Sequence, residues 1–295
     1  MMKRGIAVAA LALVLVIGGI LAFTSPPRLL SVYDRVSGGG AGARQLAEGL
    51  AFGAHGQTLD IWAPENPSAG ALPVVIFWYG GGWAKGDRAA YAFAGRALAR
   101  EGFLVVIPDY RKVPDVLFPA FLDDGAEAVA WVQANIAENG GDPARVAVMG
   151  HSAGAYQAVM LALDSQRLEA AGVDPGFIKA GVGLSGPYDF YPFDSPRSIA
   201  AFSQWPQPEA TQPITFARKD APALLLVTSE GDETVRPRNA NNLGAKLREM
   251  DAPVEVKNYG PLDHEEVVMA LSKPFRSKGP VLADSVAFLR QHLGE

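Results

Sequence analysis

Cysteine is absent from this chain of 295 residues. Without a thiol the protein has no disulfide, no cysteine nucleophile, no thiolate metal site and no cysteine-linked lipid. Positive charge is also scarce, because 26 lysines and arginines face 31 aspartates and glutamates, for a net charge of −5. No extended basic run occurs, so the composition argues against nucleic-acid binding. Only four histidines are present, which leaves few candidates for an imidazole base.

One long apolar run is present, at the N-terminus, where Lys3 and Arg4 precede an uncharged stretch over residues 5–23. This stretch nearly matches the hydrocarbon thickness of a bilayer and exceeds the usual centre of a signal peptide. We therefore predict that residues 1–24 form a membrane anchor, with the rest of the chain outside the cytoplasm. The alternative is a cleaved signal, with residues 22–24 as a weak cleavage site and a secreted or periplasmic product.

Residues 25–50 are predicted to form a flexible linker, because they begin with Pro26 and Pro27 and contain a glycine-rich stretch over residues 37–42. The remaining residues, 51–295, are enough for a single large domain. With 49% hydrophobic residues in the chain, such a domain can bury a sizeable core.

Strand-like and helix-like segments alternate through this domain. Strands are predicted at residues 58–62, 74–78, 103–107, 146–149, 180–184, 223–227 and 254–259. Helices are predicted at residues 91–100, 121–137, 153–163, 239–250 and 283–293, where apolar residues recur every three or four positions. This alternation predicts an α/β fold with a central, mostly parallel sheet flanked by helices. Residues 186–220 interrupt this alternation, because their aromatic residues and prolines recur with no fixed period. We predict that they form a cap insertion or a surface loop packed by its own aromatic residues.

The sequence Gly-His-Ser-Ala-Gly at residues 150–154 directly follows a predicted strand and opens a predicted helix. Glycines two positions on either side of Ser152 permit a sharp strand-to-helix turn, which exposes the hydroxyl. The N–H of Ala153 then faces the position of an oxyanion at a helix N-terminus. We interpret this stretch as a nucleophile elbow with Ser152 as the nucleophile.

Three further motifs follow predicted strands, and ligands in open parallel sheets bind beyond the carboxyl ends of strands. Glycines 80–82 follow the strand at residues 74–78 and leave backbone N–H groups able to approach a substrate oxygen. Asp232 follows the strand at residues 223–227 and is our choice of triad acid, with Glu230 and Glu233 as competitors.

His264 follows the last predicted strand and is the predicted base. The other three histidines fit less well, because His55 precedes the first predicted strand, His151 adjoins Ser152 and His292 lies in the terminal helix. The resulting order of serine, aspartate and histidine is the one that α/β-hydrolases use.

From about Leu59 onward the sequence resembles the α/β-hydrolase fold, and specifically the carboxylesterases related to the hormone-sensitive-lipase-like and kynurenine-formamidase-like groups. The motifs that carry the resemblance are residues 79–83, 108–111, 118–120, 150–154, 232–235 and His264. The resemblance implies a Ser152, Asp232 and His264 triad. It also implies an oxyanion hole made by the N–H groups of Gly81, Gly82 and Ala153.

Tyr79 departs from this family, which usually has histidine immediately before the glycines. The departure concerns how the glycine loop is held, and the tyrosine hydroxyl is a candidate to replace the histidine. Tyr79, Trp83, Tyr110 and Tyr188 are also predicted to line the substrate pocket, with core packing as the alternative role.

The predicted function is hydrolysis of carboxylic esters through a Ser152 acyl-enzyme, with a small-molecule ester as substrate and neither metal nor organic cofactor. An amidase, a formamidase or an envelope deacetylase has the same triad, so these alternatives stay open. A third alternative, from a different class, is a membrane-tethered interaction module that no longer turns over substrate. The sequence does not indicate the oligomeric state.

Overall fold

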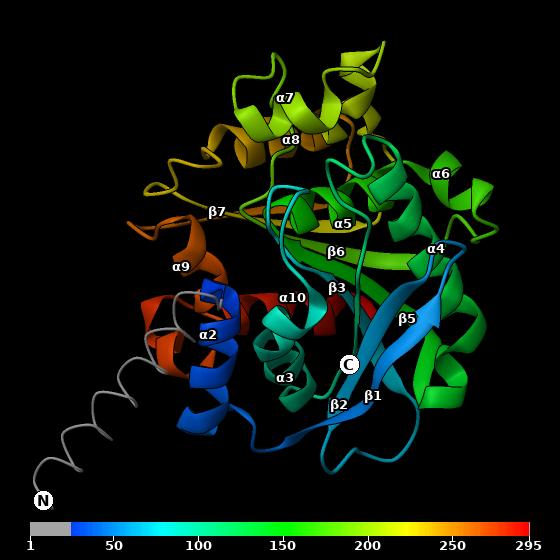
Figure 1. The fold of residues 1–295 in the computed structure, drawn as a ribbon, viewed down its shortest axis with the longest axis vertical. Helices are drawn as coiled ribbons and strands as arrows, with labels where there is room; N and C mark the ends of the chain where they lie inside the picture. Colours follow the sequence, from blue (N-terminus) through cyan, green and yellow to red (C-terminus); the bar gives the residue numbers. More distant parts are fainter. Residues whose placement is uncertain (1–24, 295) are drawn as a thin grey trace, which may run out of the picture.

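The computed structural model describes residues 25–294, and a single eight-stranded sheet runs through them (Figure 1). The strands are β1 (Ala43–Phe52), β2 (Gln57–Pro64), β3 (Leu72–Trp78), β4 (Leu104–Pro108), β5 (Gly141–His151), β6 (Ile178–Leu184), β7 (Ala223–Ser229) and β8 (Val254–Tyr259). Their order in the sheet is β1-β2-β4-β3-β5-β6-β7-β8. The pairs β1–β2 and β2–β4 are antiparallel, and all other neighbours are parallel.

Helices lie on both faces of the sheet (Figure 1). They are α2 (Pro26–Asp34), α3 (Ala92–Arg100), α4 (Ala120–Asn135), α5 (Ala153–Leu163), α6 (Ser165–Ala170), α7 (Pro196–Phe202), α8 (Arg238–Glu249), α9 (His264–Met269) and α10 (Val281–Leu293). Short 3-10 helices cover Arg88–Tyr91, Ile136–Asn139, Pro208–Thr211, Pro213–Phe216 and Lys273–Lys278. Helices α3 and α10 contact each other on one face, whereas α4, α5 and α8 cover the other.

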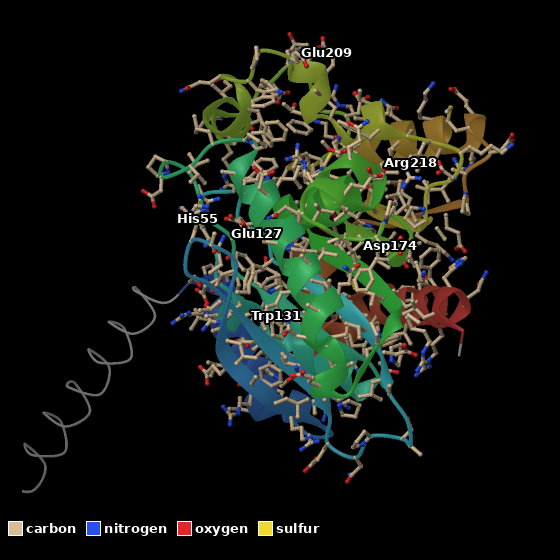
Figure 2. The ribbon with its side chains drawn as sticks, turned by 90° about the vertical axis from the view of Figure 1, so that its right-hand side faces the viewer. His55, Glu127, Trp131, Asp174, Glu209 and Arg218 are labelled. Atoms are coloured by element: carbon tan, nitrogen blue, oxygen red, sulfur yellow. The ribbon has the colours of Figure 1, made fainter. Side chains whose placement is uncertain are left out.

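The core is centred on β3 and β5, because both are flanked by parallel strands, both contact α5, and β5 also contacts α10 on the other face. Every residue of β3 is buried, as expected for a continuous run of branched and aromatic side chains in a parallel sheet. The β1–β2 turn, which carries His55, rests against α4 through a hydrogen bond from the N–H of Ala54 to Glu127 at 3.3 Å (Figure 2). His55 is therefore exposed at the edge of the domain.

The predicted fold class is confirmed, as are the seven predicted strands and the five predicted helices. Strand β1 was not predicted, because its burial pattern is weak and only Phe52 is buried. An edge strand with many exposed polar residues gives little hydrophobic signal along the sequence.

The prediction of a flexible linker over residues 25–50 is wrong, since α2 and most of β1 lie within it. Asp34, at the end of α2, is buried and accepts hydrogen bonds from Arg96 at 2.8 and 3.0 Å and from the N–H of Lys273 at 2.8 Å. The glycines that indicated flexibility instead permit close packing. A Cβ at Gly39 would lie 2.1 Å from an Asp34 carboxylate oxygen, and Gly38 has φ +82°.

The predicted anchor or signal, residues 1–24, lies outside the described residues. Within residues 25–294 there is no helix whose length and hydropathy suffice to cross a bilayer.

Candidate active site

Ser152 lies at the tip of the sharp turn between β5 and α5, with φ +55° and ψ −121°. Left-handed φ is rare for a side-chain-bearing residue and marks a strained position. The flanking glycines are required by space, because a Cβ at Gly150 would lie 2.2 Å from the Gly154 carbonyl oxygen and a Cβ at Gly154 would lie 2.1 Å from that of Trp78. The turn is held by a hydrogen bond from the Ser152 N–H to the Leu184 carbonyl at 2.9 Å. The elbow geometry expected for a nucleophile is present.

His264 is the first residue of α9, and its ring bridges two residues from other parts of the sheet. Its Nε2 lies 2.8 Å from Ser152 Oγ, and its Nδ1 lies 2.8 Å from Asp232 Oδ2. The position of α9 is defined by a capping box, in which the Asp263 carboxylate accepts the N–H of Glu266 and the Glu266 carboxylate accepts the N–H of Asp263. The three predicted triad residues therefore form one continuous hydrogen-bonded chain.

Asp232 is buried in the loop after β7, and each carboxylate oxygen has a partner. Oδ1 accepts the N–H groups of Thr234 at 3.0 Å and Val235 at 2.7 Å, which leaves Oδ2 to His264. Burial by itself raises the pKa of Asp232, but the hydrogen bond and charge of His264 and the Val235 N–H outweigh it, so that the pKa lies below its ordinary value. Asp232 is therefore ionised at neutral pH, as orientation of an imidazole requires.

The competing carboxylates of this loop lie elsewhere. Glu230 and Glu233 are both exposed, and neither makes a hydrogen bond or ion pair with His264. Asp232 is thus the carboxylate of this loop that the fold brings to the imidazole.

The glycine loop after β3 turns with left-handed backbone at Gly81, φ +140°, and Gly82, φ +60°. Side chains do not fit there, because a Cβ at Gly81 would lie 2.2 Å from the Lys85 carbonyl oxygen and a Cβ at Gly82 would lie 2.4 Å from Arg197 Cδ. Among residues 25–294 no other residue accepts a hydrogen bond from the N–H of Gly81, Gly82 or Ala153. Their N–H groups are available as donors to a substrate oxygen.

Tyr79 is fully buried beneath this loop, where its hydroxyl and ring contact the residues that follow β4. Its hydroxyl donates to Asp109 Oδ1 at 2.8 Å, and its ring stacks on Tyr110 with centroids 4.7 Å apart. Asp109 also accepts the N–H of Arg88 at 3.1 Å and an ion pair from the Arg88 guanidinium. Burial, followed by the neighbouring Tyr110 and Asp109, raises the pKa of Tyr79 well above its ordinary value, so its hydroxyl stays protonated as a donor.

Of the four predicted pocket residues, Trp83 lines the cavity that contains Ser152, and the other three do not. Tyr79 and Tyr110 lie under the glycine loop. Tyr188 is buried against Gly183 and Gly186, where an added Cβ would lie 1.9 Å from its hydroxyl oxygen and 2.4 Å from its ring, respectively. For these three tyrosines the prediction of a pocket role is wrong, because they pack in the core.

The cavity has a volume of about 630 Å³, and two segments for which the sequence predicted no lining residue form much of its wall. Residues 194–198 begin α7, within the predicted cap insertion, and residues 233–236 follow Asp232. Helix α7 packs down onto the domain through Phe202, whose ring lies 4.8 Å from that of Trp83. The segment at 186–220 thus lies against the cavity of Ser152, as a cap does.

His151 lies behind the ring of His264, although the sequence indicated only that it belongs to the elbow. Its Nδ1 lies 3.2 Å from the Tyr91 hydroxyl and its Nε2 lies 3.0 Å from the backbone oxygen of His264. Burial, followed by the charge of His264, lowers the pKa of His151 to about 3. The neutral ring therefore supports the backbone of the triad histidine from behind.

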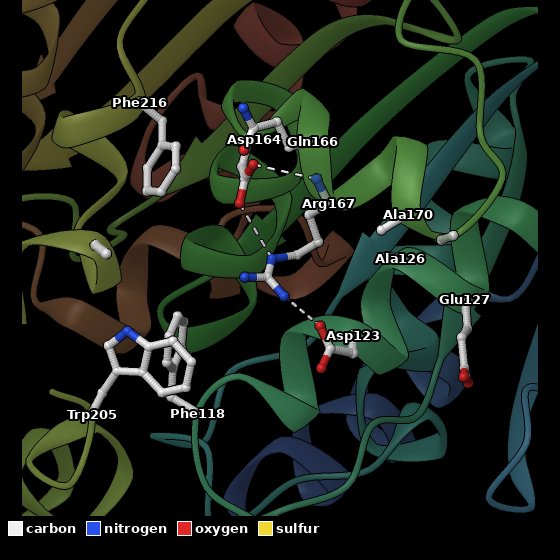
Figure 3. A pocket seen from close by; sticks show the side chains of 12 residues that line it. Phe118, Asp123, Ala126, Glu127, Asp164, Gln166, Arg167, Ala170, Trp205 and Phe216 are labelled. Atoms are coloured by element: carbon white, nitrogen blue, oxygen red, sulfur yellow. Dashed lines mark hydrogen bonds and ion pairs between the residues drawn. The ribbon is translucent and has the colours of Figure 1, made fainter. Parts of the chain in front are cut away.

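A second cavity, of about 520 Å³, lies beside α4 and α6 (Figure 3). Arg167 stands in it between Asp164, at 3.3 Å, and Asp123, and its guanidinium lies 5.8 Å from the Phe118 ring centroid. The positive charge of this arginine is thus paired within the protein. Among residues 25–294 no group of three His, Asp or Glu residues has an arrangement that could hold a metal ion.

Comparison with protein-family models places a match to BD-FAE over residues 59–247. The match begins in β2 and ends within α8, and it includes Ser152 and Asp232.

Several curated esterases are similar in sequence. The probable isoprenylcysteine alpha-carbonyl methylesterase ICMEL2 of Arabidopsis thaliana is 29% identical over 265 residues, which are 82% of this chain and 62% of the relative. Esterase LipQ of Mycobacterium tuberculosis is 28% identical over 250 residues, 78% of this chain and 58% of the relative. This chain thus spans about six-tenths of the length of the curated relatives it matches.

Solved structures of esterases share the fold. EstE1, a thermostable carboxylesterase cloned from a metagenomic library, superposes with a TM-score of 0.74 at 19% identity, over 92% of this chain and 99% of that one. An esterase of Pyrobaculum calidifontis superposes with a TM-score of 0.73 at 20% identity, over 89% and 91%.

Proposed function

Because the chain belongs to the BD-FAE family and has the α/β-hydrolase fold of carboxylesterases, we propose that it is a serine carboxylesterase acting on small-molecule esters. The observation that carries the proposal is the hydrogen-bonded chain from Ser152 Oγ through His264 to Asp232. The esterases among its relatives support the same reaction class.

In the first half of the reaction, Ser152 Oγ attacks the ester carbonyl while His264 Nε2 accepts its proton. The N–H groups of Gly81, Gly82 and Ala153 stabilise the oxyanion of the tetrahedral intermediate. His264 then returns the proton to the leaving alcohol, and the acyl group stays on Ser152. Asp232 fixes the tautomer and orientation of the imidazole and stabilises its positive charge.

In the second half, water enters with His264 as base, and the carboxylic acid leaves as Ser152 is regenerated. Every proton in this scheme moves between substrate, water, Ser152 and His264, so the proposed reaction needs neither metal nor organic cofactor. His151 does not take part in the proton transfer, because its lowered pKa keeps it neutral and both of its nitrogens are engaged.

The named substrates of the relatives differ widely, from isoprenylcysteine methyl esters to fumonisin B1, so the family supports the acyl-transfer step better than any one substrate. Amide, formamide and acetyl-ester hydrolysis stay as alternatives for the same site. The hydrogen-bonded assembly of Ser152, His264 and Asp232 weighs against a non-catalytic module.

The first test is to purify the protein and measure hydrolysis of p-nitrophenyl acetate, butyrate and octanoate beside its Ser152→Ala variant. We expect turnover by the wild type, loss of turnover in the variant, and labelling of Ser152 by a fluorophosphonate. A folded wild-type protein that hydrolyses none of these esters and takes up no fluorophosphonate contradicts the proposal.

Export also stays a proposal, with residues 1–24 as anchor or cleaved signal and the catalytic domain outside the cytoplasm. Cell fractionation and mass spectrometry of the mature N-terminus test it. Recovery of the intact chain in the soluble cytoplasm contradicts it.

A further inference from the structure

Three arginines line the cavity that contains Ser152: Arg197, Arg236 and Arg238. All three are exposed, and among residues 25–294 none makes a hydrogen bond through its side chain or an ion pair with a carboxylate. Two acidic residues, Asp194 and Glu233, also line the cavity, but among residues 25–294 neither forms an ion pair with these arginines. The charged residues that line the cavity therefore carry an excess of one positive charge, whereas the chain as a whole has a net charge of −5.

Many arginines elsewhere in the domain have a carboxylate partner, although exposed Arg35, Arg44 and Arg248 have none among residues 25–294. Ion pairs join Arg88 to Asp60, Arg96 to Asp34, Arg111 to Asp124, Arg145 to Asp142 and Arg167 to Asp123. The second cavity illustrates the contrast, since its Arg167 is held between two aspartates (Figure 3). The arginines beside Ser152 keep their donors available for a ligand.

The backbone positions of these arginines are set by ordered contacts. Arg197 is the second residue of α7, which begins with a capping box between Ser195 and Ser198, and its Cδ packs against Gly82 of the oxyanion loop. Its side chain therefore starts directly beside the reaction centre.

Arg236 and Arg238 approach from the opposite segment, the loop that carries Asp232. The carbonyl of Arg236 accepts a hydrogen bond from the buried Asn239 side chain at 3.2 Å, and Asn239 Oδ1 in turn accepts the Tyr188 N–H at 2.9 Å. The two segments thus present guanidinium groups to one cavity from fixed backbone positions.

We propose that the preferred substrate is an anionic ester, one whose acyl or alcohol part carries a carboxylate or phosphate that these arginines bind. This inference rests on the proposed esterase function and names the substrate class of that site. Guanidinium groups bind both anions through paired N–H donors, and several donors around one anion fix its position relative to the ester carbonyl. The cavity is also large enough to hold a small ester together with its charged group.

Pairs of esters that differ only in charge test the proposal. For a charge on the alcohol, the pair is 4-acetoxybenzoate and its neutral amide, 4-acetoxybenzamide, with 4-acetoxyphenyl phosphate as the phosphate case. For a charge on the acyl group, the pair is the mono-p-nitrophenyl ester of adipic acid and p-nitrophenyl hexanoate. We expect kcat/KM for the charged member of at least one pair to exceed that for the neutral member by about tenfold or more.

Arginine variants then connect that preference to the cavity. We expect Arg197→Gln, Arg236→Gln and Arg238→Gln each to reduce the ratio of anionic to neutral kcat/KM, and the triple variant to bring it close to one. Arg248→Gln is the matched control, because it removes the same charge from the same helix as Arg238 but lies outside the cavity. Its ratio is expected to equal that of the wild type.

Binding measured without turnover separates this inference from the esterase proposal. Calorimetry on the Ser152→Ala variant is expected to detect adipate, 4-hydroxybenzoate or phenyl phosphate, with weaker binding after the triple substitution. Serine-dependent hydrolysis in which neutral members match or exceed the charged ones in every pair overturns the substrate class and leaves the esterase function intact. Anion binding without hydrolysis of any ester overturns the esterase function instead.

Discussion

Two regions of the molecule meet at Ser152 and are built in opposite ways. The floor of the site consists of Ser152, Asp232 and His264, which are buried and joined by hydrogen bonds of 2.8 Å. The rim consists of Arg197, Arg236 and Arg238, which are exposed and have no carboxylate partner among the described residues. Every polar contact of the floor is satisfied within the protein, whereas the donors of the rim are left for a ligand.

The difference separates two kinds of function. A satisfied, buried network holds its geometry whatever ester enters, so changes in the floor are expected to alter the rate for all substrates. Exposed donors without partners interact only with the group that a particular substrate presents, so changes in the rim are expected to alter preference. The predictions below test whether floor and rim are separable in this way.

The largest effect is expected from Ser152→Ala, which removes the attacking oxygen. We expect kcat to fall by on the order of 10⁶-fold for charged and neutral esters alike, by analogy with other serine hydrolases. Initial rates and fluorophosphonate labelling check this. Ser203→Ala, at an exposed position just after α7, is the control and should retain activity. If Ser152→Ala loses activity toward only the charged or only the neutral esters, floor and rim are not separable.

The second-largest effect is expected from Asp232→Asn. The amide keeps the shape of the side chain but loses the charge that orients and stabilises the imidazole, so kcat should fall by about 10⁴-fold. The matched control is Glu230→Gln in the same loop, whose carboxylate is exposed and does not contact His264. Steady-state kinetics with a single ester measure kcat for both variants. Equal losses of kcat in the two contradict the assignment of Asp232 as the triad acid.

Tyr79→Phe tests the support beneath the oxyanion loop. Loss of the 2.8 Å hydrogen bond to Asp109 leaves that carboxylate with Arg88, so the loop should loosen rather than unfold. We expect kcat to fall by about tenfold or less and the free energy of unfolding by about 1–3 kcal/mol. A loss in kcat as large as that of Ser152→Ala would show that Tyr79 takes part in the chemistry.

The smallest effect concerns His151 and depends on pH. Its pKa is about 3 in the folded protein and near 6.5 when unfolded, so the unfolded chain binds an extra proton between these values. The stabilising contribution is complete above about pH 6.5 and is lost as the pH falls toward 3. Between pH 6.5 and 5 the wild type should lose about 2 kcal/mol more unfolding free energy than His151→Asn does. Urea unfolding of both proteins at both pH values measures this difference in unfolding free energy. Equal losses in the wild type and in His151→Asn contradict the lowered pKa of His151.

The sequence predicted the floor because each of its residues lies within a few positions after the end of a strand that the sequence pattern had located. Ser152, Asp232 and His264 come after β5, β7 and β8, and the carboxyl ends of parallel strands lie at one edge of a sheet. Local pattern and chain order were therefore enough to place three residues that are far apart in sequence.

The rim was not predictable in the same way. Whether Arg197 points into solvent or toward Gly82 depends on how α7 packs, and that packing involves aromatic rings from several segments with no sequence period. The tyrosines show the converse error. Tyr110 and Tyr188 lie near motif residues in sequence but are buried in the core, because a large apolar ring stabilises the interior as readily as it lines a pocket.

The prediction of a flexible linker in the N-terminal segment was wrong for a third reason. Its composition of glycine and proline indicates flexibility, but Asp34 at the end of α2 is fixed by Arg96 and Lys273, residues distant in sequence. A long-range buried ion pair has no local signature. Such pairs appear only once the tertiary structure is known.

The same ion pair also shows where the folded domain begins. With α2 starting at Pro26 and Asp34 bound to Arg96 and Lys273, residues 26–34 belong to the domain rather than to a tether. A protein shortened to begin after α2 would leave the buried Arg96 guanidinium without its carboxylate, which is costly in the interior. Activity measurements on a shortened protein therefore have to keep α2, because without it a loss of turnover would report unfolding rather than chemistry.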